Sequence, residues 1–286
     1  MISPADGALG VYGAVGDACA GRRHGFARRR ARLAARFARF RGAGDDVVAA
    51  SWYAGLLAET GLVLVDVPEG ASAGLQALAL ADFPLHGAHL AAAIPGLPAR
   101  AADIVRWHRE HEDGTGFPDA LRWDGVPADA SAVGIVHAFL SVLESDEGAG
   151  APAEAAFALS AESGRRFSVR LVTAFREFVT RDPDVAAEDD GESPGIAEAA
   201  ADDAALIALL AERVSARRGA SDRATRLGPL AVILEAATRR DRDAHAEDAA
   251  ANVAAVAERV AASVPHYAAD ARSVAAAYAA RAGAPT

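Results

Sequence analysis

Residues 104–118 constrain the fold of this chain more than any other stretch. Their first part spaces apolar side chains, from Ile104 to Trp107, as an amphipathic helix does, and this helix reaches His108 near its C-terminal end. The second part, 113–118, reads Asp-Gly-Thr-Gly-Phe-Pro. Two glycines and a proline so close together require a tight turn, because a helix cannot continue through them. The sequence therefore predicts a helix end, rich in histidine and acidic residues, that leads into a tight loop.

The composition favours helices and argues against one class of partner. Hydrophobic residues make up 52% of the 286 residues, and alanine, a strong helix former, dominates them. The chain contains no lysine, so its basic side chains are arginines and histidines. The net charge of −10 opposes non-specific binding to nucleic acid. We therefore expect a helical protein without a nucleic-acid partner.

The chain shows no sign of export or of a membrane-spanning segment. Its N-terminus lacks both the basic start and the apolar core of a signal peptide, and no uncharged apolar run is long enough to cross a bilayer. Cys19 is the only cysteine, which excludes an internal disulfide and a cysteine-based zinc site. We expect a cytoplasmic protein with no membrane partner.

The stretch after Trp107 resembles the signature of the HD-GYP family of bacterial phosphodiesterases, H-H-E-x-x-D-G-x-G-Y-P. Arg109 replaces the second histidine and Phe117 the tyrosine, and the remaining signature positions match: His108, Glu110, Asp113, Gly114, Gly116 and Pro118. The resemblance implies an all-helical fold, a site for two or three metal ions, and hydrolysis of cyclic di-GMP. It makes one group of residues candidates for ligand binding: Arg109, Asp113, Gly114, Gly116, Phe117 and Pro118.

Similar segments occur in the family's order over about residues 20–180, and this range is the expected HD-GYP-like domain. Residues 1–19 form an N-terminal segment. An acidic stretch with prolines, 181–195, is typical of a linker. The alanine-rich region 196–286 contains several helical patterns that suit a small bundle or a dimerisation element. The predicted fold is thus all-α, an HD-GYP-like domain followed by a small C-terminal helical segment.

The first two metal-binding segments of the family are partly kept. His24 opens an arginine-dense helix, residues 22–41, at the position of the first metal-binding histidine. We expect the arginines to form a solvated helix face, and a basic patch for an anionic ligand is the alternative. In the segment that names the HD superfamily, Ala58 occupies the histidine position and Glu59 the aspartate position. Glu59 can still bind a metal through oxygen, whereas Ala58 cannot.

The later segments are also altered. A helix beginning near Ala73 is expected to run into the family's H-P-x-x-G-A segment, in which Phe83 takes the histidine position. His86 lies one turn further on, and we favour an ordinary side chain over a substitute ligand there. His137 replaces the aspartate of the last metal-binding helix, and histidine is a competent ligand for iron, manganese or zinc. Residues 62–67 are apolar and β-branched and predict an extended connector.

The resemblance therefore implies one set of metal-ligand candidates, which should meet in a pocket lined by Ala58 and Phe83: His24, Glu59, His108 and His137. Arg109 places a permanent positive charge where a cation should sit, and its guanidinium could hold a phosphate instead. One divalent metal ion (iron, manganese or zinc) is the candidate cofactor, and a chain without metal is the alternative.

Two functions remain open from the sequence. The first is a catalytically degenerate HD-GYP-like signalling domain that acts by binding a cyclic dinucleotide or a signalling protein. The second is an active metal-dependent phosphohydrolase with a rebuilt single-metal site. The C-terminal helices make a homodimer a further candidate assembly.

Overall fold

The computed structural model describes residues 25–65, 72–94, 96–145, 151–182 and 184–185, with single positions between 9 and 22 and at 258 and 272. These residues form helices joined by turns, and no strand occurs among them, which confirms the all-α prediction. The predicted C-terminal helical region, 196–286, lies almost wholly outside the described residues, as does most of the linker. The α-helices are α2 (Phe26–Phe40), α3 (Asp45–Leu57), α4 (Ala73–Ala81), α5 (Phe83–Ala92), α6 (Ala99–Trp107), α7 (Ala128–Leu143), α8 (Pro152–Ala158) and α9 (Val169–Arg181). Short 3-10 helices are η1 (Thr60–Leu64), η2 (Trp123–Gly125) and η3 (Leu159–Glu162).

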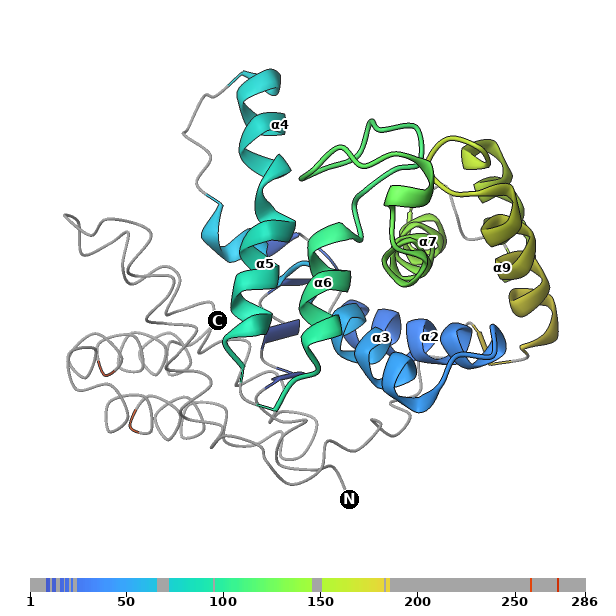
Figure 1. Ribbon diagram of the computed structural model, residues 1–286, viewed down its shortest axis with the longest axis horizontal. Helices are drawn as coiled ribbons and strands as arrows, with labels where there is room; N and C mark the ends of the chain where they lie inside the picture. Colours follow the sequence, from blue (N-terminus) through green and yellow to red (C-terminus); the bar gives the residue numbers. More distant parts are fainter. Residues whose placement is uncertain are drawn as a thin grey trace, which may run out of the picture.

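Helices α2 and α3 lie side by side at the base of the described part, with α5 and α6 on one side and α7 and α9 on the other (Figure 1). The α2–α3 contact is close because of Gly55. A methyl group at Gly55 would lie 2.7 Å from Cα of Ala31. Backbone atoms there cannot yield to a side chain, so only glycine permits this approach. The close contact brings the α2 side chains up to the C-terminal end of α3.

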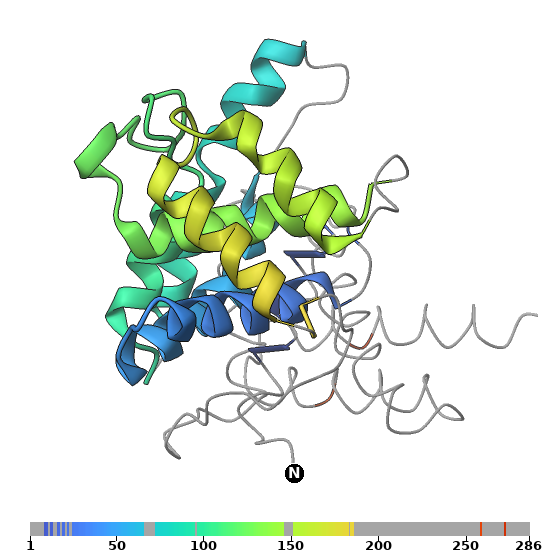
Figure 2. The ribbon, with the colours of Figure 1, turned by 90° about the vertical axis from the view of Figure 1, so that its right-hand side faces the viewer.

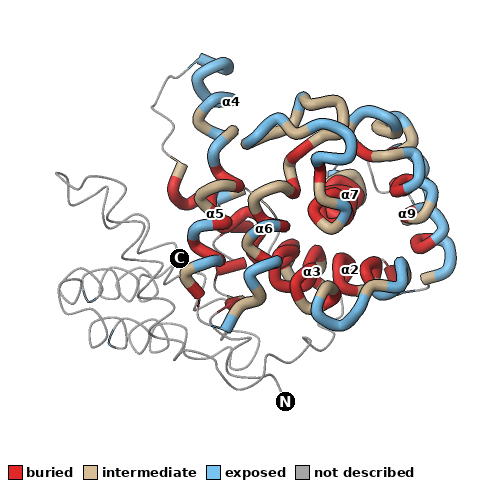
Figure 3. Tube along the Cα trace, viewed as in Figure 1, coloured by how far each residue is buried: buried red, intermediate tan, exposed pale blue. Residues whose placement is uncertain are grey.

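Helix α2 supplies two different stripes to two hydrophobic cores. Its alanines, among them Ala27, Ala31 and Ala34, pack into a core with α3, α5 and α6. Its larger apolar residues, Phe26, Leu33 and Phe37, pack into a second core with α7, α8 and α9. Phe37 makes edge-to-face contact with Phe175 of α9, at a ring-centroid distance of 5.0 Å. Figure 2 shows α9 in front of this second core, and Figure 3 shows the buried residues gathered along α2, α3 and α7.

Described residues at the two ends of the expected domain also pack into these cores. Leu9 and Tyr12, from the expected N-terminal segment, are buried in the first core. Thr60 donates a hydrogen bond to the backbone oxygen of Tyr12 over 3.0 Å. Val185, from the start of the expected linker, is buried in the second core, and Arg36 pairs with Asp182. The packed unit therefore reaches beyond both sides of residues 20–180.

Helix α4 differs from the other helices. None of its residues is buried, and Leu75 and Leu78 are exposed. It projects from the described part in both ribbon views (Figures 1 and 2). Helix α4 ends with Asp82 as its C-cap residue, and α5 begins directly after it with Phe83 and Pro84.

Two local predictions are wrong. The sequence predicts one helix from Ala73 into the segment around Phe83, whereas α4 and α5 are separate. Proline is favoured in the first turn of a helix because its missing N–H would be unpaired there anyway, so Pro84 marks a new helix start. The expected extended connector at 62–67 is wrong for 62–64, which belong to the 3-10 helix η1, in which Leu62 N–H donates to Glu59 O over 3.0 Å. With no strand beside it, an extended segment would leave such groups unpaired. Val65 is extended, and residues 66 and 67 lie outside the described residues.

One stretch, Asp45–Leu64, which combines α3 and η1, is long and apolar enough by length and composition to cross a membrane. However, 83% of its most apolar window is buried inside the protein. This burial is what a core helix of a globular fold requires, and α3 occupies that place in the first core.

Candidate functional site

The site begins at the end of α6, where the sequence predicts it. His108 is the C-cap residue of α6 and is buried. Its Nδ1 lies 2.7 Å from the backbone oxygen of Val105. Because a carbonyl oxygen can only accept, Nδ1 carries the proton and Nε2 carries a lone pair. That Nε2 is buried and has no hydrogen-bond partner among the described residues. Burial, with the charge of Arg109 next, holds the pKa of His108 well below its usual value of 6.5.

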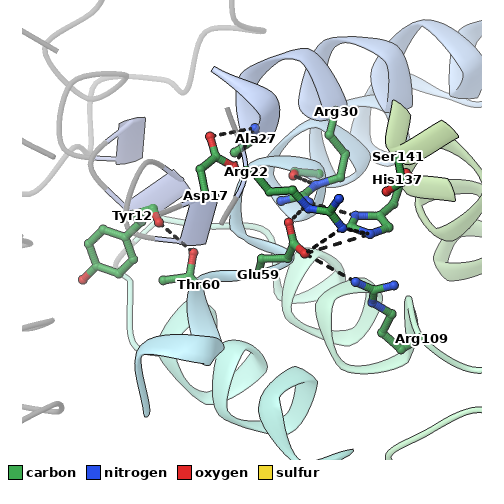
Figure 4. A network of polar contacts seen from close by, with 11 residues as sticks. Tyr12, Asp17, Arg22, Ala27, Arg30, Glu59, Thr60, Arg109, His137 and Ser141 are labelled. Atoms are coloured by element: carbon green, nitrogen blue, oxygen red, sulfur yellow. Dashed lines mark hydrogen bonds and ion pairs between the residues drawn. The ribbon is translucent and has the colours of Figure 1, made fainter. Parts of the chain in front are cut away.

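Glu59 lies at the centre of the site, between α3 and η1, with 2% of its surface exposed. Arg30 of α2, which is 0% exposed, donates to Glu59 Oε2 through Nη1 over 2.6 Å. The same side chain donates through Nε to the backbone oxygen of Gly55, also over 2.6 Å. The α2–α3 contact described above therefore places a fully buried ion pair at the end of α3 (Figure 4).

Two further arginines approach the same carboxylate. Arg109 Nη2 lies 3.4 Å from Glu59 Oε1, and Arg22 Nη2 lies 3.7 Å from the same atom. Arg109 comes from the turn after α6 and Arg22 from the segment before α2, so three separate parts of the chain converge here (Figure 4). Burial lowers the pKa of Arg109 to about 10, against the opposing effect of Glu59. Arg109 therefore remains charged at neutral pH.

His137 completes the cluster from α7. Its Nδ1 lies 3.0 Å from Arg30 Nη1, and its Nε2 lies 3.2 Å from Arg22 Nη2 and 3.9 Å from Glu59 Oε1. Burial first, and then the charges of Arg109 and Arg30, hold the pKa of His137 well below 6.5. The imidazole is therefore neutral at physiological pH, with one N–H and one lone pair.

Each of the three arginines lies close to an aromatic ring. The Arg22 and Arg30 guanidinium carbons lie 4.8 Å and 5.3 Å from the ring centroid of Phe26. The guanidinium of Arg109 lies 5.6 Å from the ring of Phe83, which also contacts the His108 ring at 5.8 Å. Phe83 thus lies beside His108 and Arg109, as the sequence predicts for a pocket residue. Ala58 is buried next to Glu59.

An acidic group lies at the N-terminal end of α2. Both carboxylate oxygens of Asp17 accept from the backbone N–H of Ala27, over 3.0 Å and 3.1 Å. Burial raises the pKa of Asp17 to about 7, although the charge of Arg30 and the bond from Ala27 act in the opposite direction.

The structure brings Glu59 and His137 together, places Arg109 beside Glu59, and places His108 beside Phe83, which also contacts Arg109. His24 lies outside the described residues. Sequence reasoning missed Arg22 and Arg30 as site residues, and the expectation of a solvated arginine face is wrong for Arg30. One signal was available: Arg30 continues the apolar stripe of Phe26, Leu33 and Phe37 at helical spacing, which points it inward.

The loop residues of the signature shape the turn itself. Asp113 Oδ1 accepts from the N–H and the hydroxyl of Thr115, over 2.9 Å and 2.6 Å. A methyl group at Gly116 would lie 2.3 Å from the N atom of His111 and 2.5 Å from Arg109 O, so the backbone folds back on itself there. Gly114 has a positive φ of 78°. The Phe117–Pro118 peptide bond is cis, and the Phe117 ring contacts Phe83 at 5.9 Å.

Glu110 ties this loop to the end of α6. Its side chain is buried, Oε1 accepts from Asp119 N–H over 2.6 Å, and Oε2 accepts from Leu121 N–H over 2.8 Å. Both carboxylate oxygens are therefore occupied by the backbone. Among the matching signature residues, Glu110 acts as a support of the turn that carries Arg109.

The described residues do not fit a divalent metal ion. A metal site needs about three protein ligands or more, and no group of three or more His, Cys, Asp or Glu side chains in the described part could hold one. Glu59 is already held by arginines, and both ring nitrogens of His137 face guanidinium groups. Arg109 adds a cation that would repel the metal. Among the described residues of the cluster, only His108 presents a ring nitrogen with a free lone pair, Nε2, as a metal ligand must.

The comparison with solved structures gives a fold neighbour. The chain is similar to a cyclic GMP-AMP specific phosphodiesterase of V. cholerae, with a TM-score of 0.62 and 14% sequence identity. The match covers 91% of this chain and 71% of the V. cholerae chain. No protein-family profile and no curated protein matches this chain at the level of sequence. The likeness therefore shows a shared helical fold.

Proposed function

We propose that this chain is an HD-GYP-like signalling module that binds a cyclic dinucleotide and does not hydrolyse it. The observation that carries the proposal is the set of guanidinium groups around Glu59, the residue at the aspartate position of the segment that names the HD superfamily. In metal-dependent hydrolysis the cation binds phosphate and also generates a hydroxide nucleophile near neutral pH. An arginine can bind the phosphate, but it cannot generate the hydroxide, because a guanidinium group does not coordinate a water molecule and lower its pKa as a metal ion does.

Two further observations support a phosphate-containing ligand. The fold neighbour is a phosphodiesterase specific for a cyclic dinucleotide. Guanidinium groups match the geometry of phosphate oxygens and form two parallel hydrogen bonds to them. Both observations support the binding of a cyclic dinucleotide through its phosphate groups.

The test compares binding with turnover. Cyclic di-GMP and cyclic GMP-AMP are titrated into the purified chain in EDTA and are then incubated with it and manganese or ferrous ions. We expect binding in EDTA and no linear dinucleotide or mononucleotide on anion-exchange chromatography. Metal-dependent product that His108→Ala abolishes, and that His89→Ala at an exposed position leaves unchanged, would contradict the proposal.

One observation favours an active phosphohydrolase as the second candidate. His108 Nε2 is buried, bears a lone pair and lacks a partner in the described part, as a metal-binding histidine would before metal enters. Metal analysis of the chain purified without chelator distinguishes the two functions. Stoichiometric iron, manganese or zinc that is lost in His108→Ala supports the enzyme.

A further inference from the structure

The cluster of side chains around Glu59 carries more positive charge than its own acidic groups balance. The guanidinium groups of Arg22, Arg30 and Arg109 face the single charge of Glu59, and His137 is neutral. Asp17, at the N-terminal end of α2, is a further acid that interacts with Arg30, and burial raises its pKa to about 7. Within the described residues, the surplus is therefore two positive charges, or one where Asp17 is ionised. This surplus is costly at Arg30, which is fully buried, unless an anion enters beside it, and the side chains of Arg22 and Arg109 are 27% and 19% exposed.

The same side chains hold unused hydrogen-bond donors. Arg30 Nη2, Arg22 Nε and Arg109 Nε are buried and lack partners among the described residues. Arginine has donors only, and a buried donor without an acceptor destabilises the fold, more so on a charged group. The cluster thus lacks acceptors.

His137 adds a further surplus donor. Both of its ring nitrogens face arginine N–H groups, Nδ1 that of Arg30 and Nε2 that of Arg22. A neutral imidazole has only one lone pair, so it can accept from only one of the two arginines. The other ring nitrogen carries a hydrogen, so this N–H and the arginine N–H that faces it are two donors with no acceptor between them.

We infer that the missing acceptor is a phosphate group, bound directly by Arg22, Arg30 and Arg109 without a divalent cation. This inference rests on the proposed function and names the part of the ligand that the pocket holds. A carboxylate brings one charge and two oxygens. A phosphodiester also brings one charge and two terminal oxygens, on a tetrahedral phosphorus, whereas a free phosphate brings four oxygens and up to two charges, which suits three guanidinium groups better. The group comes either from the phosphodiesters of a cyclic dinucleotide or from a free phosphate.

The aromatic contacts prepare the arginines for this role. Phe26 lies against Arg22 and Arg30, and Phe83 lies against Arg109. A ring against the flat face of a guanidinium holds its plane and leaves the N–H groups at the edge free to donate. It also excludes water from that face, which strengthens the attraction for an anion.

Glu59 acts as an internal competitor of the bound phosphate. It accepts from Arg30 over 2.6 Å and from Arg109 over 3.4 Å, and it forms an ion pair with Arg22 over 3.7 Å. Glu59→Gln keeps the shape of the side chain and removes its charge, so phosphate should bind more tightly to this variant. In a metal-dependent site the same substitution removes a ligand and weakens binding, so its sign separates the two mechanisms.

The experiment is isothermal titration of the full chain with inorganic phosphate in EDTA and a phosphate-free buffer. We expect wild type to bind, Glu59→Gln to bind more tightly, and Arg109→Gln to bind roughly tenfold more weakly or worse, as for the loss of a hydrogen bond to a charged group. Arg100→Gln is the matched control, since Arg100 is 54% exposed on α6 and pairs with Asp129. Far-UV circular dichroism checks folding, and Arg22→Gln replaces Arg109→Gln if the latter does not fold.

Several outcomes overturn the inference. These are no phosphate binding to either wild type or Glu59→Gln, binding only after manganese is added, or equal losses in Arg109→Gln and Arg100→Gln. A second arm with cyclic di-GMP separates it from the proposed function. Phosphate binding without cyclic dinucleotide binding refutes the proposed function and leaves the phosphate site standing. Cyclic di-GMP binding that ignores Arg109→Gln refutes the phosphate site alone.

Discussion

The buried pair of Arg30 and Glu59 gives a sharp prediction about stability. Arg30→Met keeps an unbranched side chain that suits the apolar stripe of α2, but it is shorter and removes the 2.6 Å bond to Glu59 and the 2.6 Å bond to Gly55 O. Removing one partner of a buried pair typically costs about 3–5 kcal/mol, because the other charge stays buried. Arg22 and Arg109 still face Glu59, at 3.7 Å and 3.4 Å. We therefore expect a loss near the lower end, about 3 kcal/mol.

Urea denaturation followed by circular dichroism, in phosphate-free buffer, measures this loss. For a chain of this size about 3 kcal/mol corresponds to a fall in Tm of roughly 6–12 °C. The surface pair of Arg100 and Asp129 provides the control, since Arg100→Met should cost no more than about 1 kcal/mol.

A double-mutant cycle isolates the pair itself. Once Arg30 is absent, Glu59→Gln should cost less than it does in the wild type, and we expect a coupling energy above about 1.5 kcal/mol, in the range measured for residues in contact. Losses that simply add would refute the reasoning, because they would mean that Arg30 and Glu59 stabilise the fold independently.

Three further predictions concern the loop and the start of α2. Gly116→Ala should lower the free energy of unfolding by about 1–3 kcal/mol or more in urea, because the new methyl group meets backbone at 2.3–2.5 Å. Glu110→Gln should cost about 1–3 kcal/mol and speed proteolytic cleavage between 119 and 125, since it weakens the bonds to Asp119 and Leu121; unchanged cleavage would contradict this role. The raised pKa of Asp17 means that the native state keeps a proton that the unfolded chain has lost, so Asp17 should make stability fall as pH rises from about 4 to about 7. Asp17→Asn should therefore gain stability relative to wild type across this window in a pH series of urea unfolding, and a constant difference would exclude the titration of Asp17.

The sequence predicts the fold class, and also the helix end at His108 and the turn after it, for local reasons. Apolar spacing defines α6, and glycine and proline define the turn after it, so His108 is expected at the helix end where it lies. These signals depend on residues that are close in the sequence, so they can be recognised without knowledge of the tertiary structure.

The arginine cluster could not be predicted in the same way. Arg30 and Glu59 come from different helices, and their pairing depends on the close α2–α3 contact at Gly55. In an arginine-dense helix, charge alone indicates solvent, and the inward position of Arg30 follows only when its place in the apolar stripe is given more weight than its charge. The separation of α4 and α5 at Asp82 was not predicted, because alanine and leucine on both sides of Asp82 favour one continuous helix.

The division between α4 and α5 has a consequence for how the molecule opens. Helix α4 has nine residues, none of them buried, and an isolated helix that short is only marginally stable in water. Its amide protons should exchange with solvent through local opening that costs little free energy, whereas those of α7 should exchange mainly through global unfolding. The opening of α4 ends at Asp82, because α5 starts anew with buried Phe83 and Pro84. Phe83 therefore stays in contact with Arg109 when α4 unfolds locally, and local unfolding of α4 leaves the arginine cluster unchanged.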